Sequence, residues 1–94
     1  MPEQTLPIID VTLPVVLRRL FPDAPRQVRL KAATVKDAID ALDDRWPGMR
    51  DRLCDSRPSI RRHINIFVAG ERATLQTSLA DGSDVVILTA ISGG

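Results

Sequence analysis

The sequence predicts an α+β fold, with one main helix lying across one face of a mixed five-stranded sheet. Two segments of alternating apolar and polar residues come before one helical segment, and three strand-like segments follow it. The length of 94 residues fits one domain and is too short for two independent cores. We therefore expect the element order strand, strand, helix, strand, strand, strand.

The first two strands are predicted from alternation. Residues 1–7 are read as a loose leader, followed by a single domain over residues 8–91. In residues 8–13, Ile9 and Val11 alternate with polar residues, which is the period of a half-buried strand. After a short helical turn and a proline-rich break, residues 27–33 alternate in the same way. The two strands are expected to pair as a hairpin.

The main helix is predicted to begin after Thr34. The Thr34 hydroxyl can cap the helix, and Asp37 places a carboxylate at the positive end of the helix dipole. Five apolar residues follow at spacings of three and four, which puts them on one face. They are Val35, Ala38, Ile39, Leu42 and Trp46. A Pro-Gly pair at residues 47–48 ends the helix, and residues 49–54 are expected to add a short second turn.

The remaining three strands come after a loop. Residues 63–68 show one apolar face, and a turn at residues 69–70 leads to a short strand around residues 71–73. A glycine turn at residues 81–83 then precedes residues 84–91, which are apolar almost throughout. Such a run is typical of a central strand covered on both faces.

Composition excludes several classes of function. Thirteen basic against twelve acidic residues give a net charge of +1, and aromatic residues make up only 3%, so no nucleic-acid partner is expected. One cysteine and one histidine form neither a disulfide nor a usual zinc site, so no metal is predicted. The sequence shows no export signal and no apolar segment of membrane-spanning length, and we expect a cytoplasmic protein without a membrane partner.

Several side chains have both a functional and a structural interpretation. Cys54 could act as a nucleophile or carry a persulfide, but without an evident histidine partner a structural thiol is the simpler interpretation. His63 is expected at the surface. Four arginines could form a basic patch for an acidic partner surface, or could lie on a solvated loop. They are Arg57, Arg61, Arg62 and Arg72.

The sequence ends in Ser92, Gly93 and Gly94, read as a flexible tail over residues 92–94. Because glycine has no Cβ, such a tail can pass through a channel too narrow for side chains and carry a carboxylate into another protein's active site. A carboxylate is a poor electrophile, so a partner must first activate it, for example as an acyl-adenylate, before sulfur or an amine can attack. A frayed terminus is the alternative interpretation.

The sequence resembles the ubiquitin-like β-grasp sulfur carriers of the MoaD and ThiS family. The resemblance is carried by the element order, the Leu-x-Asp-Gly-x-Asp-x-Val motif at residues 79–86 and the terminal Gly93 and Gly94. Residues 62–71, RHINIFVAGE, are most similar to the CysO branch of that family. The resemblance covers nearly the whole chain from Ile9 to Gly94, and implies a β-grasp fold.

By this resemblance, a ubiquitin-activating-type enzyme adenylates Gly94 with ATP, and a sulfur donor protein enables its conversion to a thiocarboxylate. Gly93 and Ser92 would thread into the partner. The sulfur would pass to an acceptor enzyme such as a cysteine synthase or the large subunit of molybdopterin synthase, in cofactor or cysteine biosynthesis. The chain itself would bind no cofactor and would not be an enzyme.

Three other functions stay open at this point. The chain could be a ubiquitin-like modifier joined to target lysines through Gly94. It could be the small subunit of a molybdopterin synthase, with its tail held in a catalytic partner. It could also be a β-grasp interaction domain without tail chemistry.

A docking patch for the activating enzyme or the acceptor is predicted on the sheet face away from the helix. If the apolar face of residues 64–68 points to the core, Phe67 points outward. By analogy with ubiquitin-like folds, Val86 and Leu88 share that outer face. We expect these three side chains to form the patch, and the alternative is a loop that covers them.

Overall fold

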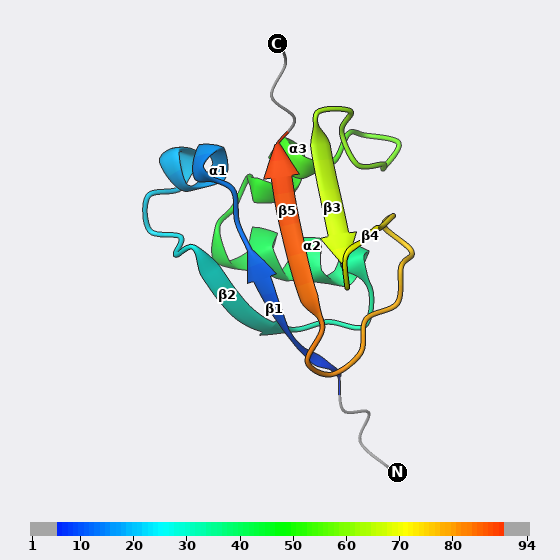
Figure 1. Ribbon diagram of the computed structural model, residues 1–94. Coiled ribbons are helices and arrows are strands. Elements are labelled where there is room, and N and C mark those ends of the chain that lie inside the picture. The colour runs from blue at the N-terminus through cyan, green and yellow to red at the C-terminus, as the bar shows by residue number, and fades with distance from the viewer. Residues whose placement is uncertain (1–5, 90–94) are drawn as a thin grey trace.

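The computed structural model describes residues 6–89 of the chain. Within this range, three helices and five strands follow one another as β1, α1, β2, α2, α3, β3, β4 and β5 (Figure 1). The five strands form one sheet in the order β2-β1-β5-β3-β4, so the last described strand lies in its centre. The predicted α+β fold with a mixed five-stranded sheet is confirmed.

The N-terminal half of the sheet is an antiparallel pair, as predicted. β1 (Ile8–Thr12) pairs with β2 (Gln27–Lys31) over the full length of both strands, although α1 (Val15–Leu20) lies between them in sequence. Ile9 and Val11 are fully buried, as their alternation predicts. Antiparallel pairing therefore survives an insertion much longer than a tight turn.

The C-terminal half of the sheet contains a tight hairpin. β3 (Ile64–Val68) and β4 (Glu71–Arg72) are joined by Ala69 and Gly70, which have φ values of 54° and 82°. Two consecutive residues with positive φ give a two-residue turn whose twist matches that of the strands. β5 (Asp84–Thr89) runs antiparallel to β3 and parallel to β1, and so joins the two halves of the sheet.

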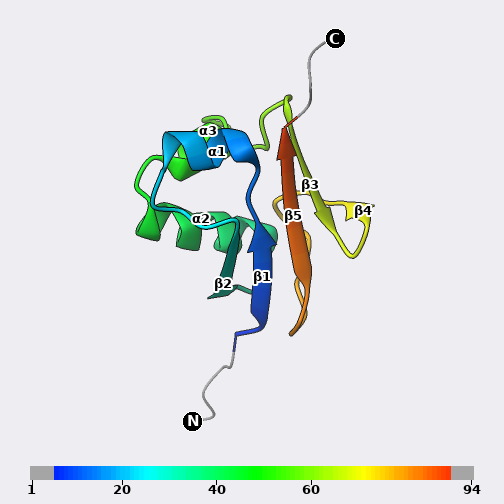
Figure 2. The ribbon, with the colours of Figure 1, turned by 60° about the vertical axis from the view of Figure 1, so that its left-hand side comes forward.

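The helices cover one face of the sheet, as Figure 2 shows from the side. α2 (Val35–Arg45) begins where predicted, because the backbone N–H of Asp37 donates to the Thr34 hydroxyl at 3.2 Å. α3 (Met49–Leu53) follows directly. The apolar face of α2 closes the core together with Leu53, which is fully buried.

The prediction that the last strand is covered on both faces is wrong. Val85 and Ile87 are each 1% exposed beneath the helices, whereas Leu88 on the opposite face is 46% exposed. Among the described residues, every helix lies on the inner face (Figure 2). The apolar run therefore supplies one buried face and one accessible face. None of the described helices is long and apolar enough to span a membrane.

Candidate partner-binding site

The structure places all three residues of the predicted patch on the outer face of the sheet. Phe67 on β3 lies directly opposite Val86 on β5, so their side chains are cross-strand neighbours. Leu88 follows two residues further along β5 and lies opposite Asn65. Phe67 and Val86 are half-buried, while Leu88 is exposed. We call Phe67, Val86 and Leu88 the outer-face patch.

The outer face changes character along β5. At the start of the strand, Asp84 lies beside Asp10 of β1, and Arg29 of β2 forms an ion pair with Asp10 at 3.1 Å. At the level of Phe67, the neighbour on β4 is Arg72. The apolar part of this face is thus displaced toward the C-terminal end of β5, and charged groups border it.

The patch lies near the point where the described part of β5 ends. Thr89 is the last described residue, and it pairs with Ile64 at the start of β3. Figure 1 shows this end of β5 beside the loop that precedes β3. The predicted reactive residue Gly94 and the predicted threading residues Ser92 and Gly93 lie outside the described residues.

The four arginines of the predicted basic patch are only partly brought together. Arg57 is held by Asp55, whose carboxylate also accepts hydrogen bonds from the backbone N–H and the hydroxyl of Ser59. The hydrogen bond from Arg57 holds the pKa of Asp55 well below its usual range. Arg61, Arg62 and Arg72 line a common groove at the sheet edge.

Cys54 has the surroundings of a structural thiol. Its side chain is 6% exposed, and burial, together with the nearby Asp40 and Asp55 carboxylates, raises the pKa of the thiol. Because the thiolate is the nucleophilic form, a raised pKa disfavours a persulfide-carrying role. His63 is exposed, as expected. Within residues 6–89, no cluster of three or more His, Cys, Asp or Glu side chains could hold a metal ion.

Sequence reasoning missed an apolar surface on α1. Val15, Val16 and Leu20 are 57%, 46% and 48% exposed, and Leu17 is the residue of this helix that is buried. A six-residue helix is too short for periodicity to separate its faces, so the sequence offered little signal. Figure 1 shows α1 near the same end of the sheet as the end of β5.

These features define a class of protein. A mixed sheet in the order β2-β1-β5-β3-β4, with helices on one face and a central C-terminal strand, is the β-grasp fold of ubiquitin-like proteins. The sequence model described as the ThiS family matches residues 11–94. The chain belongs to this family.

Curated relatives agree with this assignment. "Sulfur carrier protein CysO" of Mycobacterium tuberculosis is 32% identical over 92 residues, covering 92% of this chain and 98% of that protein. "Small archaeal modifier protein 1" of Haloferax volcanii is 36% identical over 62 residues, covering 66% of this chain and 71% of that protein. Both names describe carriers or modifiers rather than catalysts.

Solved structures give the same result. A chain of the Amycolatopsis orientalis BexX/CysO complex superposes with a TM-score of 0.81 at 31% identity, covering 92% of this chain and 99% of that chain. The crystal structure of SAMP1 from Haloferax volcanii gives a TM-score of 0.78 at 30% identity, with 93% and 99% covered. The predicted resemblance to ubiquitin-like sulfur carriers, CysO among them, is confirmed.

Proposed function

We propose that this protein carries sulfur as a thiocarboxylate at Gly94, after a partner enzyme has activated the Gly94 carboxylate with ATP. The observation that supports this most directly is the ThiS family match, which extends through Gly93 to residue 94. The relatives named as sulfur carriers match over nearly the same length. The chain supplies the carboxylate and the folded domain that presents it, while ATP is bound and consumed by the partner.

The chemistry proceeds in two steps. A Gly94 carboxylate oxygen attacks the α-phosphorus of ATP, and the bond to the β-phosphate oxygen breaks, releasing pyrophosphate and leaving an acyl-adenylate. Hydrosulfide, supplied through a sulfur donor protein, then attacks the acyl carbon. The new C–S bond replaces the C–O bond to AMP, which leaves. Gly93 contributes a tail without side chains that fits a narrow channel.

Delivery of the sulfur regenerates the carboxylate. The thiocarboxylate sulfur adds to an electrophilic, unsaturated carbon of a substrate held by the acceptor enzyme; the π bond breaks, its electron pair takes up a proton, and a thioester forms. Hydrolysis of the acyl C–S bond returns the Gly94 carboxylate and leaves the sulfur on the product. The acceptor is an enzyme of cofactor or cysteine biosynthesis, such as a cysteine synthase or the large subunit of a molybdopterin synthase.

The outer-face patch docks these partners. Leu88 is exposed next to a half-buried Phe67 and Val86 pair, and the patch lies near the end of β5. Removal of apolar surface from water favours association. A partner seated on the patch therefore holds the domain where the chain continues toward Gly94.

Intact-mass measurement after coexpression with the activating enzyme and a sulfur source tests the proposal. The wild-type chain is expected to gain the mass difference between one sulfur and one oxygen. A chain lacking Gly94 is the control and is expected to stay unmodified. An unmodified wild-type mass, with no ATP turnover by the partner, contradicts the proposal.

A second candidate function is conjugation of Gly94 to lysines of target proteins. The similarity to Small archaeal modifier protein 1 of Haloferax volcanii favours it. Both functions share the activation step and differ in whether sulfur or an amine attacks the acyl-adenylate. Mass spectrometry of protease-digested cell extracts distinguishes the two functions. Conjugation leaves a remnant of the C-terminal tail on target lysines, whereas sulfur transfer does not.

A further inference from the structure

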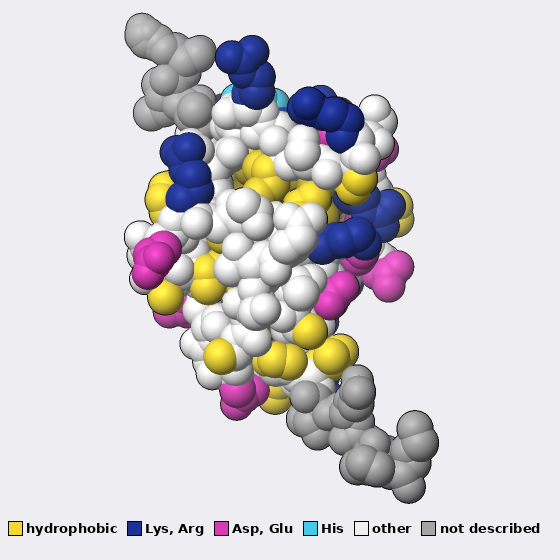
Figure 3. Space-filling model, turned by 90° about the vertical axis from the view of Figure 1, so that its right-hand side faces the viewer, with side chains coloured by type: hydrophobic (Ala, Val, Ile, Leu, Met, Phe, Trp, Pro, Cys, Tyr) yellow, Lys and Arg dark blue, Asp and Glu magenta, His cyan; other side chains and the backbone are white. Residues whose placement is uncertain are grey.

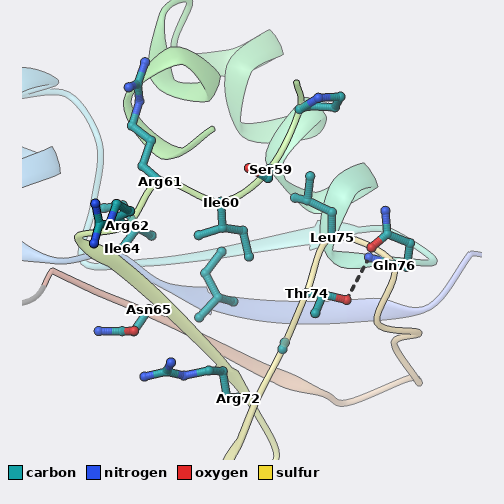
Figure 4. Close-up of a pocket in the computed structure, with 13 residues that line it drawn as sticks. Ser59, Ile60, Arg61, Arg62, Ile64, Asn65, Arg72, Thr74, Leu75 and Gln76 are labelled. Carbon is teal, nitrogen blue, oxygen red and sulfur yellow. Dashed lines mark hydrogen bonds between the residues drawn. The ribbon is translucent and has the colours of Figure 1, made fainter. Parts of the chain in front are cut away.

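A groove of about 430 Å³ opens at the β3 and β4 edge of the sheet (Figure 4). One wall is formed by residues 58–62 and the start of β3, and the other by residues 72–76. Its volume lies within the range of about 300–1,000 Å³ that is usual for ligand pockets.

The groove exists because β4 leaves β3 early. β4 pairs with β3 only at Phe67 and Val68, and one further backbone bond joins the Ala73 N–H to the Ile66 carbonyl at 2.8 Å. The chain is then drawn toward α2, because the Leu75 carbonyl accepts from Lys36 N–H at 2.9 Å. The early part of β3 is left without a neighbouring strand on this side.

The opposite wall is held in place by local hydrogen bonds. Asp55 accepts from the backbone N–H groups of Arg57 and Ser59, at 3.0 and 2.9 Å. Arg61 N–H donates to the Leu53 carbonyl at 2.9 Å, which ties this wall to the end of α3. Both walls are thus anchored to the helical layer, and the groove is preformed.

The floor of the groove is aliphatic and its rim is cationic. Ile60, Ile64 and Leu75 are among the aliphatic residues that line the groove. Figure 4 shows Ile60 and Leu75 on its two opposite walls. Arg62 and Arg72 lie at its opening on the side of Asn65 (Figure 4). Figure 3 shows basic side chains gathered around apolar ones on this face of the molecule. The lining residues include three arginines and no carboxylate.

The rim arginines, Arg62 and Arg72, differ from three other arginines of the structure in having no acidic partner among the described residues. Arg29, Arg50 and Arg57 are each paired with an aspartate, at 3.1, 2.9 and 2.6 Å. Among the described residues, neither Arg62 nor Arg72 forms an ion pair within 4.0 Å. Their charge is available to a partner.

The groove also borders the outer-face patch. Arg72 lies opposite Phe67, and Asn65 lies opposite Leu88, so two groove residues are cross-strand neighbours of two patch residues. The outer-face patch and the groove therefore form one continuous surface, and one partner can contact both. This continuity favours a protein segment over a free small molecule, and the absence of aromatic lining residues gives a nucleobase nothing to stack on.

We propose that this groove binds an acidic segment of the adenylating partner, with an aliphatic side chain between Ile60 and Leu75 and carboxylates on Arg62 and Arg72. This inference rests on the proposed function, because the partner is the enzyme that activates Gly94. Guanidinium groups bind carboxylates through two parallel hydrogen bonds, so the rim orients the segment as well as attracting it. The groove thus adds a charged, directional contact to the apolar outer-face patch.

ATP–pyrophosphate exchange by the adenylating enzyme of the same organism tests the groove. The Arg62→Glu/Arg72→Glu double variant is expected to raise the KM for the carrier about tenfold or more, with kcat changed less than about twofold. Arg62→Lys/Arg72→Lys keeps the charge and loses the bidentate geometry, so an intermediate KM is expected. Because both arginines are exposed, these substitutions are expected to leave the fold intact. Urea unfolding curves that coincide with that of the wild type will verify this.

Lys31→Glu/Arg45→Glu is the matched control. These two residues line a surface at the opposite, β2 edge of the sheet, and the substitution changes the net charge by the same amount. Its KM is expected to stay within about twofold of wild type. An equal rise in both double variants, or no rise in Arg62→Glu/Arg72→Glu, overturns the proposed groove.

A chain lacking Gly94 separates this result from the proposed function. Exchange that persists without Gly94 contradicts the proposed function, while the KM comparison still decides whether the groove binds. If the wild-type chain supports no ATP–pyrophosphate exchange, binding of the wild type and of the same variants to the adenylating enzyme is measured by calorimetric titration instead. Equal binding by wild type and Arg62→Glu/Arg72→Glu, or no binding by wild type, overturns the groove.

Discussion

The two faces of β5 carry similar side chains in opposite surroundings. On the inner face, Val85 and Ile87 are each 1% exposed and pack beneath the helices. On the outer face, Val86 is half-buried and Leu88 is 46% exposed. Hydrophobicity alone therefore does not identify the core in this strand. The inner face stabilises the fold, whereas the outer face is free to contact another protein.

The difference arises from what the neighbouring elements contribute to each face. The inner face is closed by α2 and α3, whose Leu42 and Leu53 are fully buried. On the outer face, Val86 and Leu88 lie opposite Phe67 and Asn65 of β3, and no described helix covers them. Full burial of a large aliphatic side chain is worth about 1.5–3 kcal/mol, so this contrast has measurable consequences.

The largest effect is expected for Ile87→Ala, which removes a buried side chain and leaves a cavity. The free energy of unfolding should fall by about 2–4 kcal/mol, measured by urea denaturation followed by circular dichroism. Leu88→Ala on the other face should cost less than about 1 kcal/mol, because that side chain is already half in water. Equal losses in the two variants would show that the faces do not differ as described.

The next effect concerns binding rather than stability. Leu88→Asn should raise the KM for the carrier in ATP–pyrophosphate exchange about tenfold, equivalent to about 1.4 kcal/mol. The urea midpoint should barely change. Ile8→Asn is the control, since Ile8 is 41% exposed and belongs to β1 near the opposite end of the sheet. The docking role of the outer face is rejected if both variants weaken the interaction alike.

A smaller effect is expected on the helical layer that covers the inner face. Thr34→Ala removes the oxygen that accepts from Asp37 N–H at 3.2 Å, and should lower the free energy of unfolding by about 1 kcal/mol. Thr34→Ser keeps the hydroxyl and should retain most of that stability. Thermal unfolding measures both. Exchange kinetics should be unaffected, because Thr34 precedes α2 on the helical side.

The smallest effect is expected on the charged part of the outer face. Asp10→Asn removes the partner of Arg29 in a pair whose side chains are 36% and 74% exposed. Exposed ion pairs contribute about 0.2–1 kcal/mol, and screening by salt reduces this further. The stability difference between variant and wild type should therefore shrink between low and high NaCl. A difference that is insensitive to salt would argue against a Coulombic contribution.

The order of the elements was predictable because local periodicity determines it. Alternation identified β1 and β2, and Thr34 with the following apolar residues identified α2. The apolar run at the end of the chain did not show which of its residues face the helices, because period-two patterning disappears when both faces are apolar. Burial and strand register in the structure provide that information.

The groove was not predictable for a different reason. The sequence indicates its arginines, but its walls come from residues 58–62 and 72–76, which only the tertiary fold brings together. Arg57 belongs to the same sequence cluster and is instead paired with Asp55 at 2.6 Å. Sequence proximity therefore grouped one arginine wrongly and gave no indication of the aliphatic floor.

The central position of β5 also has a consequence for biosynthesis. The two halves of the sheet, β2 with β1 and β3 with β4, are bridged by β5, which is the last strand among the described residues. A nascent or truncated chain that lacks β5 leaves Val11 and Ile66 without their central neighbours, and cannot complete its core. A chain that ends before β5 therefore lacks both a complete core and the Val86 and Leu88 side chains of the outer-face patch.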